Sequence, residues 1–223
     1  MRKTTGDVIY EHLRNRIISL SLKPGEELPI LELSKELGVS RSPVRDALMR
    51  LQGEALVEIV PQKGCWVKAI DVERAAEERF LRASLEKNVL QRFAESMKPS
   101  AITRLEYYLQ LQKEAAERRD GAAFYSSDDM MHATFFEETG LMRLWRVIER
   151  ESGDYRRIRI LSLDSDGIYE KNIKQHRCLI DALSSGDIEK ALEIENEHLS
   201  KVVFELDGII GKHPGYFCNG RRK

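Results

Sequence analysis

Apolar residues recur at helical spacing along most of this 223-residue sequence, and strand-like alternation is confined to one short stretch. The first apolar stripe predicts a helix over residues 5–20 and consists of Val8, Ile9, Leu13, Ile17 and Leu20. The sequence Lys-Pro-Gly at 23–25 ends this helix, because proline and glycine both interrupt helical backbone. A short helix is predicted over residues 30–38, and a third over residues 41–54 with Pro43 in its first turn.

The alternating stretch predicts a two-stranded hairpin directly after the third helix. Residues 55–60 (ALVEIV) and 65–70 (CWVKAI) alternate apolar and polar positions, and the tip of the turn between them is Gln62-Lys63-Gly64. A helix, a short helix, a tight turn and a third helix make a helix-turn-helix, to which the hairpin adds a wing. Residues 1–70 are therefore predicted to form a winged helix-turn-helix DNA-binding domain.

From residue 71 onward the pattern is helical throughout. Breaks at Pro, Gly and Asp divide it into six predicted helices, over residues 71–97, 100–119, 122–138, 141–163, 167–184 and 188–211. Asp71 and Asp187 are expected to cap the first and the last of these helices. The predicted fold class is mainly α, with an all-helical bundle of six to seven helices at residues 71–212 and a loosely ordered tail at residues 213–223.

Composition excludes several classes of protein. No apolar run approaches the ~18 residues of a membrane span, and the N-terminus lacks the apolar core of a secretory signal. The three cysteines are widely spaced and form no CxxC pair, so a reducing, cytoplasmic location is expected. The net charge is −1, but residues 1–70 hold 11 Lys and Arg against 9 Asp and Glu. This slight local excess of positive charge permits DNA binding by the first domain.

Polar and basic residues gather at the start of the third predicted helix, in its cap and first turns: Ser40, Arg41, Ser42 and Arg45. Arg41 and Arg45 are four residues apart and project from one face, which is typical of a recognition helix in the DNA major groove. Lys63 could reach a phosphate, and Gly64 would let the wing backbone approach the duplex closely. The alternative is a solvated helix face on a protein-interaction domain.

The helical region carries a candidate metal site made of four residues: Asp128, His132, His176 and His198. Asp128 and His132 are four residues apart on one predicted helix and therefore share a face. His176 lies 11 residues before Asp187 and His198 lies 11 residues after it, so the two lie abreast in an antiparallel helical pair. One carboxylate and three imidazoles suit Zn²⁺, Ni²⁺, Mn²⁺ or Fe²⁺. The alternative is a set of unrelated polar residues on helix surfaces.

The segment PGEELPILELSKELGVSRSPVRDALMRLQGEALVEIVPQKGCWV, residues 24–67, closely resembles the DNA-binding domain of the GntR superfamily of bacterial transcriptional regulators. The run VSRSPVRDAL is a specific signature of that domain. The resemblance implies that Arg41, Arg45 and Gly64 contact DNA. Many relatives have an arginine early in the second helix where this chain has Leu31, so one phosphate contact of the family is not expected here.

Residues 71–211 resemble the all-helical effector domain, called FCD, of the FadR-like branch of that superfamily. The matching motifs are Arg82-x-x-Leu85-Glu86, Asp128-x-x-x-His132, and His176 with His198. In metal-binding members the four residues at the positions of the candidate site hold a divalent ion. The resemblance also implies that Arg82 faces the effector cavity, and Arg159 is a second candidate for binding an anionic effector. The alternative for both arginines is a surface or interhelical salt bridge.

These features predict a ligand-responsive bacterial transcriptional regulator, of the repressor type, and not an enzyme. It would bind a pseudo-palindromic double-stranded DNA operator as a homodimer. Its helical domain would bind a divalent metal and a small organic acid, such as a sugar acid. One alternative is a metal-sensing regulator, in which the ion is the signal. The other is a metal-dependent enzyme with an interaction-type winged helix, although no HExxH motif is present.

Overall fold

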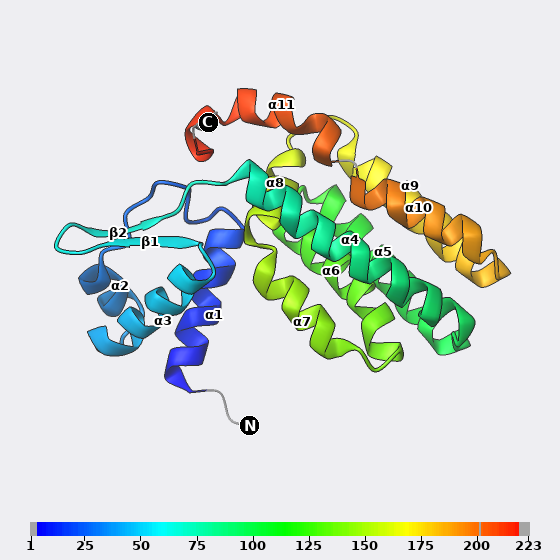
Figure 1. Ribbon diagram of the computed structural model, residues 1–223, viewed down its shortest axis with the longest axis horizontal. Coiled ribbons are helices and arrows are strands. Elements are labelled where there is room, and N and C mark those ends of the chain that lie inside the picture. Colours follow the sequence, from blue (N-terminus) through cyan, green and yellow to red (C-terminus); the bar gives the residue numbers. More distant parts are fainter. Residues whose placement is uncertain (1–3, 201, 219–223) are drawn as a thin grey trace.

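The computed structural model describes residues 4–200 and 202–218 of the protein. Figure 1 shows a small N-terminal part, drawn in blue and cyan, beside a larger helical bundle that contains the rest of the chain. Within the described residues, no helix combines the length and the apolar character that crossing a membrane requires. The predicted fold class, mainly α with a winged helix-turn-helix and a helical bundle, is confirmed.

The N-terminal part has the element order of a winged helix-turn-helix. Its helices are α1 (Thr5–Ile18), α2 (Ile30–Glu36) and α3 (Arg41–Gly53), followed by the antiparallel strands β1 (Val57–Val60) and β2 (Gly64–Val67). These elements share one apolar core, in which Leu13, Val44 and Leu51 are fully buried. Each buried side chain of this size stabilises the fold by roughly 1.5–3 kcal/mol relative to an exposed one. The three predicted helices and the hairpin are therefore confirmed.

Gly64 has a structural role in the wing. It pairs with Val60 at the turn between the strands, and its backbone has a φ of +150°. A Cβ at this position would lie 2.9 Å from the indole ring of Trp66. The packing of the wing itself therefore requires a glycine here, independently of any close approach to DNA.

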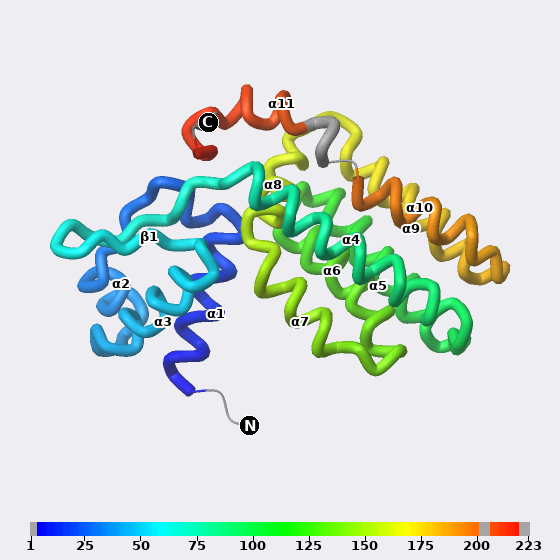
Figure 2. Tube along the Cα trace, in the orientation of Figure 1, coloured from blue at the N-terminus to red at the C-terminus, as the bar shows by residue number. Residues whose placement is uncertain are grey.

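The remaining described residues form eight α-helices and a short 3-10 helix, η1 (Pro214–Tyr216). The α-helices are α4 (Val72–Glu95), α5 (Pro99–Glu117), α6 (Gly121–Glu138), α7 (Met142–Glu151), α8 (Gly153–Ser162), α9 (Ile168–Ser185), α10 (Ile188–Ser200) and α11 (Val202–Lys212). Helix α4 packs against α6, α7, α8 and α10, and α5 packs against α6 and α9. In Figure 2, α9 and α10 run side by side as an antiparallel pair.

The helix caps follow the expected chemistry. The carboxylate of Asp71 accepts hydrogen bonds from the backbone N–H groups of Glu73 and Arg74, at 3.0 and 3.2 Å. The carboxylate of Asp187 accepts one from the N–H of Lys190, at 3.0 Å. Both caps satisfy backbone donors that have no partner in the first turn of a helix. The two predicted caps are confirmed.

The helix predicted over residues 141–163 is two helices, and this prediction is corrected. Helix α7 ends and α8 begins at Ser152, whose φ of −113° and ψ of 32° leave the helical region. Gly153 follows, and a Cβ there would lie 2.8 Å from the side chain of Leu56 in the N-terminal domain. The break therefore lies at a contact between the bundle and the N-terminal domain, which the apolar pattern does not record.

The C-terminal predictions also need correction. The helix expected over 188–211 is divided into α10 and α11, and residue 201 between them lies outside the described residues. The tail was expected to be loosely ordered, but Phe217 forms a parallel bridge with Ile70 and is buried. The N–H of Ile70 donates to the carbonyl of Tyr216 at 2.8 Å. Residues 213–218 therefore cover the segment between the two domains, while residues 219–223 lie outside the description.

Candidate functional site

The structure brings the four predicted metal ligands together inside the bundle. Asp128 and His132 lie on α6, His176 lies on α9 and His198 lies on α10. One potential ligand atom of each residue lies within 4.8 Å of the corresponding atom of the others. Asp128 and His132 are fully buried, and His176 and His198 are 1% and 8% exposed. The alternative of unrelated residues on helix surfaces is therefore excluded.

The three imidazoles turn the same nitrogen, Nε2, toward Asp128. The Nε2 atoms of His176 and His198 lie 3.5 and 3.7 Å from Asp128 Oδ1, and His132 Nε2 lies 3.7 Å from Asp128 Oδ2. His176 Nε2 and His198 Nε2 are 3.4 Å apart. The expectation that these two histidines lie abreast in an antiparallel pair is confirmed. Helix α9 ends at Gly186, whose φ of +75° allows the tight turn into α10.

The opposite ring nitrogen of each histidine faces an oxygen of a surrounding side chain. His176 Nδ1 lies 2.6 Å from Gln112 Oε1, and His198 Nδ1 lies 3.4 Å from Gln175 Oε1. His132 Nδ1 contacts the carboxylates of Glu86 and Glu195, at 2.7 and 3.2 Å. The acceptor at His176 holds the proton on Nδ1, which leaves the lone pair of Nε2 directed at the centre of the cluster. Outer partners of this kind orient histidines in metal sites.

Two buried atoms at this centre lack a hydrogen-bond partner among the described residues: Asp128 Oδ1 and His132 Nε2. A buried polar atom without a partner is costly, so such atoms call for an explanation. One carboxylate oxygen and three imidazole nitrogens converging on one point are the donor set of a transition-metal site. The residues present therefore fit a divalent ion.

The electrostatics of the cluster keep Asp128 ionised and His132 protonated. Burial acts to raise the pKa of Asp128, but Arg159 and the three imidazoles outweigh it and hold that pKa well below its usual range. Burial acts to lower the pKa of His132, but the carboxylates of Glu86 and Glu195 raise it to about 10. Asp128 therefore stays ionised, which is the form that binds a metal ion, and an ion bound by His132 must displace a proton from that ring.

The two predicted effector-binding arginines lie beside the metal cluster and are buried. Arg82 on α4 donates to Glu86 at 2.8 Å and lies 3.5 Å from Asp129. Arg159 on α8 bonds Asp128 through Nη2 and donates to Asp129 at 3.0 Å through Nη1. Its guanidinium also stacks 4.2 Å from the ring centroid of Tyr125. Both arginines therefore make interhelical ion pairs at the edge of the candidate site.

Sequence reasoning missed the residues that surround the ligands. Gln112 comes from α5 and reaches His176 across the bundle, so no local spacing could reveal it. Glu195 could have been found, because it precedes His198 by three residues and shares its helix face. Glu86 was named in the motif with Arg82, with which it pairs, but its contact with His132 was not predicted.

The predicted DNA-contacting residues share one side of the N-terminal domain. Ser40, Arg41, Ser42 and Arg45 are exposed at the start of α3, and Lys63 is exposed at the tip of the wing. The concave surface between α3 and the wing includes Arg45, Lys63 and Gly64. Ser40 is the N-cap of α3, although its side chain makes no capping hydrogen bond. An exposed basic helix start beside a basic wing tip is the arrangement of DNA-binding winged helices.

The comparisons with known proteins agree with this arrangement. Residues 5–67 match the family described as "Bacterial regulatory proteins, gntR family", and residues 79–201 match the FCD domain. The chain is 30% identical over 209 residues to the HTH-type transcriptional repressor RspR of Escherichia coli, covering 94% of this chain and 92% of the relative. It is also 30% identical over 210 residues to an HTH-type transcriptional regulator of an unstable DNA locus in Streptomyces ambofaciens, covering 94% and 88%.

The solved structure of E. coli McbR/YncC has the same fold, with a TM-score of 0.80 at 19% identity, covering 95% of this chain and all of that one. The fold and the relatives thus define a bacterial DNA-binding transcriptional regulator of the winged helix-turn-helix class. The chain belongs to the GntR family and carries an FCD domain. It is a regulator and not an enzyme, so the alternative of a metal-dependent enzyme is set aside.

Proposed function

We propose that this GntR-family regulator is a repressor controlled by a divalent transition metal together with a small carboxylate. Acting in the cytoplasm as a homodimer, it binds a pseudo-palindromic operator, because the two-fold symmetry of a dimer matches two half-sites on the duplex. Ser40, Arg41, Ser42 and Arg45 contact the major groove, and Lys63 and Gly64 contact the DNA backbone beside it. The repressor name of one relative supports the direction of regulation.

The convergence of four buried ligand atoms carries the metal part of this proposal. Asp128, His132, His176 and His198 hold the ion, which is Zn²⁺, Ni²⁺, Mn²⁺ or Fe²⁺. The bound ion supplies positive charge that attracts an anionic effector. The orphaned Asp128 Oδ1 and His132 Nε2 support this assignment, since neither atom has a hydrogen-bond partner among the described residues.

Arg82 and Arg159 complete the binding site for the effector in this proposal. A carboxylate accepts paired hydrogen bonds from a guanidinium, and such charge-assisted bonds are stronger than neutral ones. Both arginines already hold the carboxylates of Asp128 and Asp129, so their donors are directed at this region. Effector binding then changes the population of dimers whose DNA-binding domains have the spacing of the operator.

Operator binding measured with and without metal tests the proposal. Duplexes that the protein binds are first selected from a random DNA library, and affinity is then followed by fluorescence anisotropy. We expect gluconate, a simple sugar acid, to release DNA from the metal-loaded protein and to have little effect after metal is removed with a chelator. Release by metal alone would favour a metal sensor, in which the ion is the signal. Failure to select any DNA would contradict the proposal.

A further inference from the structure

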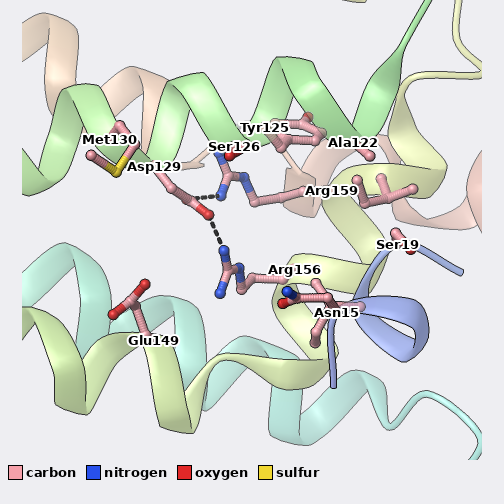
Figure 3. A pocket seen from close by; sticks show the side chains of 12 residues that line it. Asn15, Ser19, Ala122, Tyr125, Ser126, Asp129, Met130, Glu149, Arg156 and Arg159 are labelled. Carbon is pink, nitrogen blue, oxygen red and sulfur yellow. Dashed lines mark hydrogen bonds and ion pairs between the residues drawn. The ribbon is translucent and has the colours of Figure 1, made fainter. Parts of the chain in front are cut away.

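A second cavity lies outside the metal cluster, at the junction between the two domains. It has a volume of about 310 Å³ and is bounded by α1 of the DNA-binding domain and by α6, α7 and α8 of the bundle. Figure 3 shows Asn15 and Ser19 at one side of it, with Arg156 and Arg159 directed at Asp129. The size lies at the lower end of the range for small-molecule sites, which is roughly 300–1,000 Å³.

The lining of this junction pocket is mixed, and its polar groups offer both donors and acceptors. Asp129 accepts hydrogen bonds from Arg156 and from Arg159, so its charge is shared by two guanidinium groups. The Arg156 side chain is 19% exposed, and its Nη2 donates to the carboxylate of Asp129. Asn15, Ser19 and Glu149 add an amide, a hydroxyl and a carboxylate to the walls. A ligand with one carboxylate and several hydroxyl groups matches such a surface.

We propose that the junction pocket binds a small polyhydroxy carboxylate, with the ligand carboxylate on Arg156 and ligand hydroxyl groups on Asn15, Ser19 and Glu149. This site goes beyond the proposed function: it is separate from the effector site proposed beside Arg82, which does not line the pocket, and it lies against the DNA-binding domain. Asn15 lies on α1, and Ser19 is the residue that caps the C-terminal end of this helix. The ligand therefore joins the two domains directly.

Arg159 links this pocket to the metal cluster. One guanidinium nitrogen bonds Asp128, whose other carboxylate oxygen faces the Nε2 atoms of His176 and His198. A second nitrogen of Arg159 donates to Asp129 in the pocket wall. A metal ion on Asp128 and an anion in the pocket thus act on the same side chain. Binding of the two is coupled, and each changes the affinity for the other by the same factor.

The same junction already holds the DNA-binding domain in place. Arg14, adjacent to Asn15 on α1, donates to Glu54 at 2.7 Å and also bonds the backbone carbonyl of Glu149. A ligand seated between Asn15 and Glu149 lies next to this contact. Its occupancy favours one orientation of α1 relative to the bundle, and it shifts the population of dimers in that orientation.

Calorimetric titration of the metal-loaded, full-length protein with sodium D-gluconate tests the inference. D-Glucitol has similar hydroxyl groups without the carboxylate, and hexanoate has the carboxylate without the hydroxyl groups. We expect gluconate to bind and both control compounds to bind at least ten-fold more weakly. Arg156→Gln should weaken gluconate binding at least ten-fold, and Asn15→Ala should weaken it several-fold. Asn15 is exposed, so its substitution leaves the core intact.

Arg150→Gln is the matched control for Arg156→Gln. Arg150 lies on α7, and 62% of its side chain is exposed. Among the contacts described it pairs only with its neighbour Glu151. It should bind gluconate like the wild type. Gluconate affinity that is unchanged in both Arg156→Gln and Asn15→Ala would overturn the inference, as would a wild type that does not bind gluconate. Metal content and operator binding of the same preparations separate this failure from a failure of the proposed function.

Discussion

Gln112 orients His176 from across the bundle, and its substitution isolates the effect of an outer hydrogen bond on metal binding. It is fully buried on α5, and its Oε1 lies 2.6 Å from His176 Nδ1. Gln112→Leu keeps a similar volume but removes the acceptor that holds the ring in place. We expect metal affinity to fall by about 10–100-fold, the usual effect of losing an outer partner.

Competition with a chromogenic chelator measures this affinity. Gln110→Leu is the control, because Gln110 lies on the same helix but is exposed and bonds Glu114 instead. Equal metal affinity in Gln112→Leu and in the wild type would show that Gln112 only packs against the histidine.

Glu78 makes stability depend on pH. Burial, helped by the nearby Asp154, raises the pKa of Glu78 to about 7 from the usual 4.5. The folded state then keeps a proton that the unfolded state releases, so the free energy of unfolding falls as pH rises from about 4.5 to 7. We expect the Glu78→Gln variant to lack this part of the decline, which amounts to up to about 3 kcal/mol.

Urea denaturation at pH 5 and pH 8 checks the Glu78 prediction. The Gln side chain can still accept the hydrogen bond that Tyr155 N–H makes to Glu78 at 2.8 Å. The wild type should therefore lose more stability than the variant between the two pH values. Parallel losses in the two proteins would contradict the assigned pKa.

At the residue scale, sequence spacing predicted the ligands better than their surroundings. The separation of Asp128 from His132, and the equal distances of His176 and His198 from the turn, follow from helix geometry alone. The contact of Gln112 depends on how α5 packs against α9, and the contact of Asp129 depends on how α8 packs against α6. Local periodicity contains neither. The roles of all these residues in binding stay predictions.

Helix α3 presents the basic surface that we propose binds DNA. Arg45 is exposed one turn after Arg41 on the same face. We expect Arg45→Ala to weaken operator binding by about 1–3 kcal/mol if the side chain contacts a base. Fluorescence anisotropy with a selected operator measures the change. Arg118 is exposed at the end of α5, so Arg118→Ala should leave operator affinity unchanged. Equal operator affinity in the two variants would show that Arg45 does not contact DNA.

Helix α8 is fixed to the segment between the domains by one buried arginine. Arg157 is fully buried, bonds Asp154 on its own helix and donates to the carbonyl of Lys68 at 2.7 Å. Arg157→Leu leaves Asp154 buried without its partner, so we expect a loss of about 3–5 kcal/mol in the free energy of unfolding. Asp154→Asn combined with Arg157→Leu should recover part of that loss in urea denaturation. No recovery would show that the ion pair is not the source of the effect.

The helices and the hairpin followed from apolar periodicity, whereas the helix break at Ser152 and the ordered tail did not. Residues 141–163 have a continuous apolar stripe, yet the chain leaves helical geometry at Ser152, next to the contact of Gly153 with Leu56 of the other domain. The tail from His213 to Cys218 is ordered because Phe217 and Tyr216 pack against Ile70. Both features arise from contacts between distant segments, so a local pattern cannot predict them.

At the scale of the whole molecule, the metal cluster, Arg159 and the junction pocket form a continuous path from the bundle to α1. Figure 1 shows α1 lying next to the bundle near α7 and α8. Side-chain contacts join Asp128 to Asp129 through Arg159, and a ligand in the junction pocket would extend this path to Asn15 and Ser19. Such a path carries regulation only if both sites favour the same arrangement of the two domains.

Elemental analysis of the untagged protein, purified without chelator, tests the central claim, which is that Asp128, His132, His176 and His198 form a transition-metal site. We expect about one transition-metal ion per chain, as a site of four protein ligands holds. The Asp128→Ala/His198→Ala double variant should contain none, while a His12→Ala/Asp166→Ala control with two exposed positions should keep full content. A metal-free wild type, or equal metal in the double variant, would contradict the account.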